Sequence, residues 1–125
     1  MRNRIFKISI LGLVFLLTAV TFNSCQKAKD TIGVIIVKDS EGLTVPGAYV
    51  ILHQDSLISP QGNYTNPELR KTDYTDANGR AEFTYEREAV LNVQVEKKEG
   101  NNVYTGSSII RLLKGKTETK TVEIN

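Results

Sequence analysis

The chain has 125 residues, of which 40% are hydrophobic and 24% are charged, and its formal net charge is +2. This length suffices for one small domain and is too short for two once an export signal is removed. One cysteine and one histidine almost exclude a metal site built from nitrogen and sulfur ligands. Residues 1–24 hold three basic side chains and no acidic one, which leaves 13 basic and 14 acidic residues in the remainder. A remainder with a net charge of −1 and no basic cluster argues against binding to nucleic acid.

Residues 1–24 are predicted to be an export signal. Three basic residues, Arg2, Arg4 and Lys7, precede an apolar stretch at positions 8–20. As a helix this stretch would rise about 20 Å at ~1.5 Å per residue, which is short of the ~30 Å hydrocarbon core of a membrane. A charged flank, a short apolar centre and a small polar exit are typical of a secretory signal peptide. A permanent transmembrane anchor is the alternative.

The exit of this segment reads Phe22-Asn23-Ser24-Cys25 and resembles the lipobox of bacterial lipoproteins. In those proteins a small residue, here Ser24, precedes a cysteine that receives diacylglycerol and becomes the acylated N-terminus after cleavage. The resemblance implies that Cys25 carries acyl chains such as palmitate, which would bind the protein to a membrane. Phe22 and Asn23 depart from the usual leucine and small residue. Ordinary cleavage, which would leave Cys25 as a free thiol, is the alternative.

Residues 25–30 follow as a short polar tether without apolar periodicity. The residue after the cysteine is Gln26 rather than aspartate. In the lipoproteins that this segment resembles, that choice implies sorting to the outer membrane instead of retention in the inner one. The periplasmic and the surface face of that membrane are both left open.

Residues 31–125 are predicted to form an all-β domain, because apolar side chains recur at every second position and polar turns separate the runs. Leu91, Val93 and Val95 alternate with polar residues and give the clearest example. Asp76-Ala77-Asn78-Gly79 is typical of a tight turn, since Asn and Gly tolerate a positive φ. The predicted strands are 32–38, 49–53, 70–75, 80–86, 91–96, 103–113 and 117–124. Seven such strands predict a single antiparallel β-sandwich of Ig-like type.

Three motifs in this domain occur together. The first comprises Gly33, Val37-Lys38-Asp39, Gly42 and Val45-Pro46-Gly47-Ala48-Tyr49-Val50. The second is Thr75-Asp76-Ala77-Asn78-Gly79-Arg80-Ala81-Glu82-Phe83, and the third is Lys114-Gly115-Lys116. Together they resemble the opening, the central turn and the last hairpin of carboxypeptidase regulatory-like domains, which are transthyretin-like sandwiches. The resemblance covers about residues 31–125 and implies a structural or accessory module without catalytic residues of its own.

A small group of residues invites a catalytic interpretation. His53, Asp55 and Ser56 cluster where a predicted strand runs into a loop, and a serine nucleophile needs a base that an acid orients. Nothing in the sequence supplies the strained turn or the oxyanion hole that such a nucleophile requires. The prediction is therefore a surface histidine beside polar neighbours, and no catalytic residue.

A second group of polar residues could form a metal site. Asp73, Asp76 and Asn78 could offer oxygen ligands to calcium, but they lack the dense acidic spacing of a dedicated loop. Asp and Asn commonly cap turns by accepting hydrogen bonds from nearby backbone amides. Turn capping is the prediction for these residues, with no metal and no cofactor.

Lys38, Glu96 and Asn125 lie near the positions at which related sandwiches of surface adhesins form an internal Lys–Asn isopeptide bond. Each of the three is one residue out of register with the inward positions of its strand. A shift of one residue moves a side chain to the opposite face of a sheet. No crosslink is therefore predicted.

Residues 54–69 form a long connection that contains Pro, Gly and Asn residues and exceeds the usual hairpin length. Within it, Tyr64 together with Asn63 and Asn66 could contact a carbohydrate or a peptide, because an aromatic face stacks while amides form hydrogen bonds. A decorated loop that binds no ligand is the alternative.

These features together predict a non-enzymatic lipoprotein of the outer membrane. Residues 1–24 are its signal peptide, residues 25–30 its lipidated tether and residues 31–125 its sandwich domain. The expected role is a structural or interaction module of the cell envelope, held to the membrane by Cys25 and bound to another envelope protein. The alternative is an accessory lipoprotein that binds glycans or peptides through the 54–69 loop.

Overall fold

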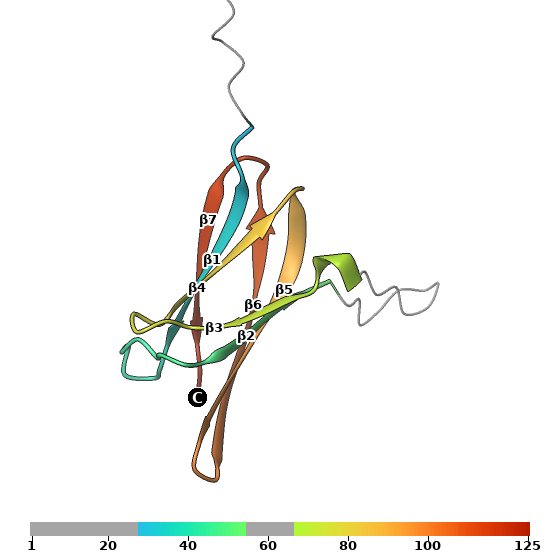
Figure 1. The fold of residues 1–125 in the computed structure, drawn as a ribbon. Coiled ribbons are helices and arrows are strands. Elements are labelled where there is room, and N and C mark those ends of the chain that lie inside the picture. The colour runs from blue at the N-terminus through green and yellow to red at the C-terminus, as the bar shows by residue number, and fades with distance from the viewer. Residues whose placement is uncertain (1–27, 55–66) are drawn as a thin grey trace, which may run out of the picture.

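The computed structural model describes residues 28–54 and 67–125. Within these ranges the chain folds into strands that form two layers (Figure 1). The elements are β1 (Thr31–Lys38), β2 (Tyr49–His53), η2 (Pro67–Leu69), β3 (Lys71–Tyr74), β4 (Arg80–Tyr85), β5 (Ala89–Glu99), β6 (Asn102–Leu112) and β7 (Thr117–Glu123). All seven predicted strands are present. β5 is longer than predicted, because it continues into a hairpin with β6 up to the pair Glu99↔Asn102.

The strands form one sheet of three strands in the order β4-β1-β7 and one of four strands in the order β3-β2-β5-β6. Every paired neighbour is antiparallel except β1 and β7, which run parallel from Ile32↔Thr117 to Lys38↔Glu123. The prediction of a purely antiparallel sandwich is therefore wrong at this pair. After β6 the chain crosses to the other sheet, where β7 lies along the edge of β1 in the same direction. Because side chains alternate with the same period in both kinds of pairing, the pattern contains no information on direction.

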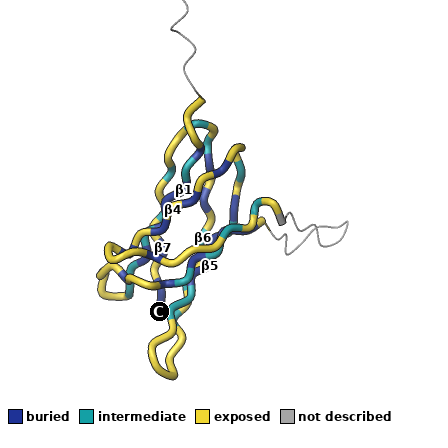
Figure 2. Tube along the Cα trace, in the orientation of Figure 1, coloured by how far each residue is buried: buried dark blue, intermediate teal, exposed yellow. Residues whose placement is uncertain are grey.

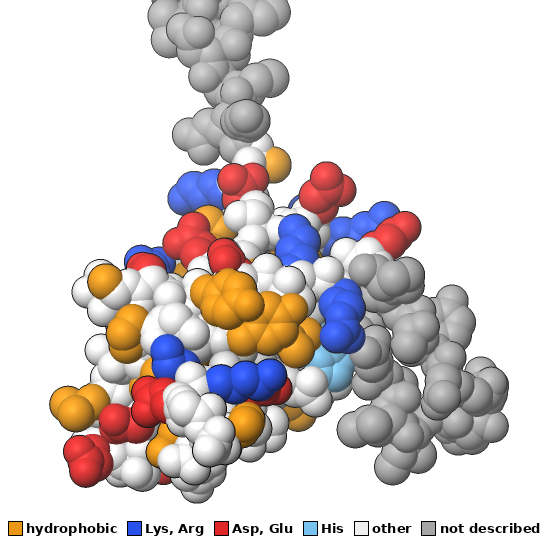
Figure 3. All heavy atoms as spheres, turned by 60° about the horizontal axis from the view of Figure 1, so that its bottom comes forward, with side chains coloured by type: hydrophobic (Ala, Val, Ile, Leu, Met, Phe, Trp, Pro, Cys, Tyr) orange, Lys and Arg blue, Asp and Glu red, His pale blue; other side chains and the backbone are white. Residues whose placement is uncertain are grey.

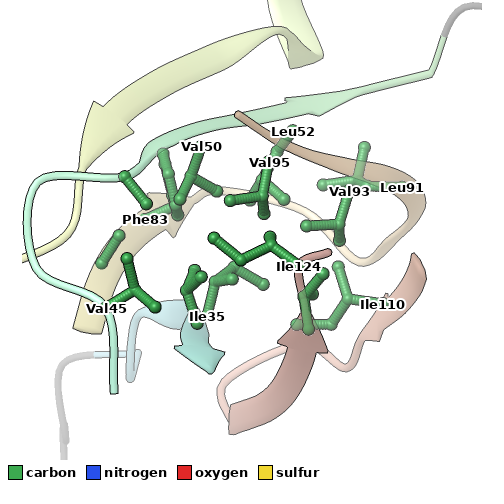
Figure 4. Packing of buried hydrophobic residues seen from close by; sticks show 14 of the residues in the cluster. Ile35, Val45, Val50, Leu52, Phe83, Leu91, Val93, Val95, Ile110 and Ile124 are labelled. Carbon is green, nitrogen blue, oxygen red and sulfur yellow. The ribbon is translucent and has the colours of Figure 1, made fainter. Parts of the chain in front are cut away.

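The inward faces of the two sheets form one apolar core, shown at close range in Figure 4. The predicted alternation is confirmed on three strands, since Val37, Val93 and Val122 are buried. Figure 2 shows the same division along the described part of the trace, with buried stretches inside the strands and exposed turns between them. Fully burying one such aliphatic side chain contributes roughly 1.5–3 kcal/mol. The core comprises Ile35, Val37, Val45, Ala48, Val50, Leu52, Ala81, Phe83, Tyr85, Leu91, Val93, Val95, Ile110, Leu112, Val122 and Ile124.

The two sheets come together at a corner formed by β6 and the end of β7. There the backbone amide of Asn125 donates to the carbonyl of Thr105 at 3.2 Å, and the amide of Thr105 donates to the carbonyl of Asn125 at 3.3 Å. Gly106 makes this approach possible, because a Cβ atom at that position would overlap the carbonyl oxygen of Glu123. These two hydrogen bonds join Asn125 to β6 at the edge of the four-stranded sheet.

The opposite corner, between β3 and β4, is closed by side chains. The Tyr85 hydroxyl donates to the carbonyl of Leu69 at 3.0 Å, and the Lys71 ammonium group lies 4.6 Å from the centre of the Tyr85 ring. The same ammonium group donates to the carbonyl of Thr84 on β4. Burial raises the pKa of the Tyr85 phenol to about 12, because a charged phenolate would be poorly solvated there.

The predicted turn at Asp76–Gly79 joins β3 to β4 and requires glycine at its last position. Gly79 has a φ of +71°, and a Cβ atom there would lie 2.9 Å from the amide nitrogen of Val45. Asp76 caps the turn as predicted, because its Oδ1 accepts from the amides of Asn78 at 2.8 Å and Arg80 at 3.1 Å.

The described chain enters the sandwich at one end and finishes near the other (Figure 1). At the entry end, Lys29 lies close to Gly115 in the turn between β6 and β7. The β5–β6 hairpin and Asn125 lie toward the opposite end. The β5–β6 hairpin is therefore among the parts of the domain that lie far from the residues before β1.

Candidate functional site

The register of the strands defines the outer face of the four-stranded sheet. Because Val50, Leu52, Val93 and Val95 point into the core, the residues between them point outward. Pairing extends this face across all four strands. Its residues are Tyr49 and Ile51 on β2, Thr72 and Tyr74 on β3, Val90, Asn92, Gln94, Glu96 and Lys98 on β5, and Val103, Thr105, Ser107, Ile109 and Arg111 on β6.

Exposed apolar side chains of the described residues are concentrated on this outer face. Four of the five large ones lie there, namely Tyr74, Val90, Val103 and Ile109, with exposed fractions between 52% and 63%. The fifth, Leu43, lies in the turn after β1. Figure 3 shows a group of apolar side chains on the surface of the sandwich, with charged side chains around it. A single exposed apolar residue is ordinary, whereas several on one sheet face mark it as a candidate contact surface.

Two tyrosine rings form the aromatic part of this face. Tyr49 and Tyr74 lie directly opposite each other on β2 and β3, with ring centres 5.0 Å apart and planes inclined by 45°. Tyr49 is half-buried, whereas Tyr74 is 63% exposed. The pair therefore presents an aromatic surface in which the Tyr74 ring is accessible from solvent and the Tyr49 ring is partly covered.

A hollow of about 530 Å³ lies over β5 and β6 and extends to Glu123 at the end of β7, and Glu96, which borders it, pairs with Tyr49 on β2. Two acidic side chains border it, Glu96 and Glu123, and among the described residues that line it none is basic. The Glu96 carboxylate accepts an ion-pair contact of 3.3 Å from Lys98, which lies outside the lining. The lining consists of Ile51, Gln94, Val95, Glu96, Thr105, Gly106, Ser107, Glu123 and Asn125. Most of these side chains can donate or accept hydrogen bonds.

The residues predicted for lipidation and for ligand contact cannot be placed by this structure. Cys25 lies outside the described residues, and so do Asn63, Tyr64 and Asn66. The ends of the 54–69 loop are described, and Gln54 and Leu69 line a second hollow of about 420 Å³ together with Lys71, Tyr85 and Arg87. The assignments at Cys25 and in the loop stay predictions.

The prediction of a surface histidine is wrong. His53 is only 5% exposed, although its position on β2 continues the outward series of Tyr49 and Ile51. Its neighbour in the sheet is Asn92 on β5. Asp55 and Ser56, the other members of the considered catalytic group, lie outside the described residues. A side chain with so little exposed area is poorly placed to meet a substrate from solution.

Of the three residues considered for a Lys–Asn crosslink, Glu96 and Asn125 line the same hollow, whereas Lys38 lies on β1 and does not line it. Lys38 and Glu96 are half-buried and Asn125 is exposed, and Glu96 faces the hollow with its contact to Lys98. The described residues contain no group of three or more His, Cys, Asp or Glu side chains that could hold a metal ion. Within the same ranges, no helix is long and apolar enough to span a membrane.

The outer face is a candidate site that no motif in the sequence indicated. Tyr49 and Tyr74 were visible as strand residues, but their meeting depends on the pairing of β2 with β3 across a long connection. A usable signal did exist, since Tyr49 and Ile51 occupy the positions between the inward residues Val50 and Leu52. Large apolar side chains at outward positions of a strand are a reason to look for a ligand.

Comparison with known proteins assigns no family. No family model matches the chain, and no curated protein matches it. Three solved structures share the general β-sandwich form. They are catechol 1,2-dioxygenase from Acinetobacter sp. ADP1, with 12% identity and a TM-score of 0.49, a protein of Pseudomonas aeruginosa provisionally named as carbohydrate-binding, with 10% and 0.47, and chlorocatechol 1,2-dioxygenase from Pseudomonas putida, with 16% and 0.44.

These similarities are distant and concern shape alone. The aligned regions cover 82%, 82% and 81% of this chain, but only 54% and 62% of the two dioxygenase chains, against 93% of the Pseudomonas aeruginosa protein. At such low identity a shared sandwich does not carry activity or ligand from one protein to another. The resemblance to carboxypeptidase regulatory-like domains accordingly stays a prediction.

Proposed function

We propose that this chain is a non-enzymatic lipoprotein of the outer membrane that holds a β-sandwich at the membrane as an interaction module of the cell envelope. One observation carries the interaction role: four of the five large exposed apolar side chains among the described residues lie on the outer face of one sheet. The lipobox-like Ser24-Cys25 pair and the preceding apolar stretch support the membrane anchor.

The position of the tether fits an anchored module. Residues 25–30 lead directly into β1, and an extended chain covers at most about 3.3–3.6 Å per residue. A lipid on Cys25 would therefore keep the entry end of the sandwich within roughly 20 Å of the membrane surface. The β5–β6 hairpin, which lies toward the opposite end of the domain, would then point away from the lipid (Figure 1).

The anchor is tested by the mass of the N-terminal peptide and by membrane fractionation. We expect wild-type protein to sediment with the outer membrane and to carry a diacylated or triacylated Cys25. The Cys25→Ala variant should lose the acyl chains and leave the outer-membrane fraction, because it has no lipid attachment point for that membrane. Ser24→Ala is the matched control, since alanine is also small and should preserve processing. Unmodified Cys25 in a soluble fraction would contradict the proposal.

The interaction role is tested separately by crosslinking in intact cells. A photoreactive amino acid at Ile109 lies on the outer face of the four-stranded sheet, whereas one at Thr121 lies on the outer side of the other sheet. We expect a crosslinked species from position 109, an adduct to either a polysaccharide or a protein, and none from position 121. Equal crosslinking from both positions, or none from either, would contradict a binding role for this face.

The alternative of ligand binding through the 54–69 loop has a direct test of its own. The hollow bordered by Gln54, Leu69 and Tyr85 lies at the base of that loop and would offer a first contact surface. In this alternative, Tyr64→Ala abolishes binding to glycans or peptides while the fold is preserved. Retained binding in that variant would assign the ligand to another surface.

A further inference from the structure

We propose that the hollow on the outer face of the four-stranded sheet, with the adjoining Tyr49–Tyr74 pair, binds an uncharged oligosaccharide. This inference rests on the proposed interaction role and names the chemical class of the partner. It differs in place from the 54–69 loop, because the residues that carry it belong to the paired strands. Paired strands position side chains more rigidly than a loop does.

The register places complementary groups in two adjacent rows across the sheet. The first row is Tyr74, Tyr49, Glu96 and Thr105, and the second is Thr72, Ile51, Gln94 and Ser107. Neighbouring strands lie ~4.8 Å apart, so each row spans roughly 14 Å. An aromatic surface therefore stands at one end of the rows and hydrogen-bonding groups stand at the other.

This order of groups fits the chemistry of a sugar chain. One face of a pyranose ring presents C–H groups that pack on an aromatic ring, while its hydroxyl groups both donate and accept hydrogen bonds. Tyr74 supplies an accessible aromatic ring, since the residue is 63% exposed. The Gln94 amide donates and accepts, the Glu96 carboxylate accepts, and the Thr105 and Ser107 hydroxyls do both. The hollow of about 530 Å³ lies within the ~300–1,000 Å³ usual for small-ligand sites.

The charge around the hollow selects against acidic sugars. Glu96 and Glu123 border it, and within the described part of the chain the only ion-pair contact to either is from Lys98 to Glu96 at 3.3 Å. Lys98 offsets the charge of Glu96 in part, but no basic side chain is among the described lining residues, so a ligand carboxylate or phosphate would be repelled most strongly near Glu123. An uncharged polyhydroxylated chain avoids this repulsion and can donate hydroxyl protons to both carboxylates.

The remaining exposed apolar residues argue against a protein partner on the same face. Ile109 pairs with Asn92, Val103 pairs with Lys98, and Val90 pairs with Arg111. Each is thus opposite a polar side chain, so these apolar groups are interspersed with polar ones. The buried centre of a protein–protein interface is apolar and depleted in charge. A mixed surface with one aromatic pair beside a polar hollow suits a sugar chain better.

The test uses the full chain in detergent and native gels that contain a soluble polysaccharide. The neutral probes are xylan, galactomannan and mixed-linkage β-glucan, and the acidic probe is polygalacturonate. We expect at least one neutral probe to retard the protein and polygalacturonate to leave its mobility unchanged. Tyr74→Ala should weaken the binding about tenfold or more, whereas Tyr74→Phe should keep most of it because the ring remains.

Two further variants separate the hollow from the rings and from the fold. Gln94→Ala should weaken binding several-fold by removing an amide that both donates and accepts. Thr121→Ala changes a similarly exposed residue on the outer side of the other sheet and should bind like wild type. Thermal unfolding of every variant checks that each is folded, and Gln94→Ala keeps the test decisive if Tyr74→Ala is destabilised.

Three outcomes would overturn the inference: no retardation by any neutral probe, stronger retardation by polygalacturonate, or unchanged binding in both Tyr74→Ala and Gln94→Ala. The crosslinking experiment at Ile109 distinguishes these failures from failure of the interaction role. A discrete protein adduct at that position without glycan binding would replace the sugar chain by a protein and leave the interaction role in place. Absence of both would remove the two proposals together.

Discussion

Tyr85 lies in a buried environment, where its neutral phenol and its charged phenolate would have different effects on the stability of the fold. Its ring is 5% exposed, its hydroxyl donates to the carbonyl of Leu69 at 3.0 Å, and the Lys71 ammonium group lies above the ring. Burial raises its pKa from 10.0 to about 12. The folded protein therefore holds the phenol proton more tightly than the unfolded chain does.

This pKa shift predicts a loss of stability at alkaline pH. Below pH 10 the neutral phenol is present in both states, and its contribution is complete. Between pH 10 and 12 the unfolded chain ionises first, so the free energy of unfolding should fall by up to roughly 1.4 kcal/mol per pH unit. Tyr85→Phe should unfold with a weaker pH dependence, measured by urea titration between pH 8 and 11.5.

The control for this prediction is Tyr74→Phe, because Tyr74 is exposed. That variant should follow the wild-type pH profile. At neutral pH, Tyr85→Phe should also cost about 1 kcal/mol, since it removes the hydrogen bond to Leu69. Identical alkaline profiles for Tyr85→Phe and wild type would show that the phenol does not contribute in this way.

At the scale of elements, the contact between β6 and β7 depends on one glycine. A Cβ atom on Gly106 would overlap the carbonyl oxygen of Glu123 and lie 3.0 Å from Cγ1 of Val122. Because the obstacle is backbone, it cannot move aside as the end of a flexible side chain could. Gly106→Ala should therefore destabilise the domain by roughly 1–3 kcal/mol or more, measured by chemical denaturation.

The matched control is Ser107→Ala, the next residue on β6, which points outward and is exposed. It should change stability by no more than about 0.5 kcal/mol. Gly106→Ala should also loosen the mutual hydrogen bonds between Thr105 and Asn125, which amide hydrogen exchange would detect. Stability equal to wild type would mean that β7 has room to move away from β6.

The elements also show what could be read from sequence and what could not. Strand positions and inward residues such as Val93 and Val122 followed from the two-residue period alone. The parallel direction of β7 did not, because alternation is the same in both directions. Nor did the burial of His53 or the meeting of Tyr49 with Tyr74, since both depend on which strands become neighbours. The candidate site therefore depends on which strands pair with each other, and no local sequence motif indicates it.

At the scale of the whole molecule, the two sheets have few ways to open independently. β1 is the middle strand of its sheet and is paired on both sides with strands distant in sequence, β4 and β7. β5 is an inner strand of the other sheet, between β2 and β6. Both strands send their apolar side chains into the same core, which includes Ile35, Val37, Val93 and Val95. Opening either sheet would therefore expose the core of both.

This arrangement predicts that β1 and β5 unfold as one cooperative unit. In native-state hydrogen exchange, the slowest amides of both strands should share one free energy of opening, equal to that of global unfolding. Amides of β3 and of the turn around Gly100 should exchange faster, because β3 is a four-residue edge strand and Gly100 lies in an exposed hairpin turn. Ile35→Val, which trims the shared core, should lower the opening free energy of both strands by the same amount, about 0.5–1.5 kcal/mol. A smaller effect in β5 than in β1 would mean that the three-stranded sheet opens by itself, and the sandwich would then consist of two separable layers.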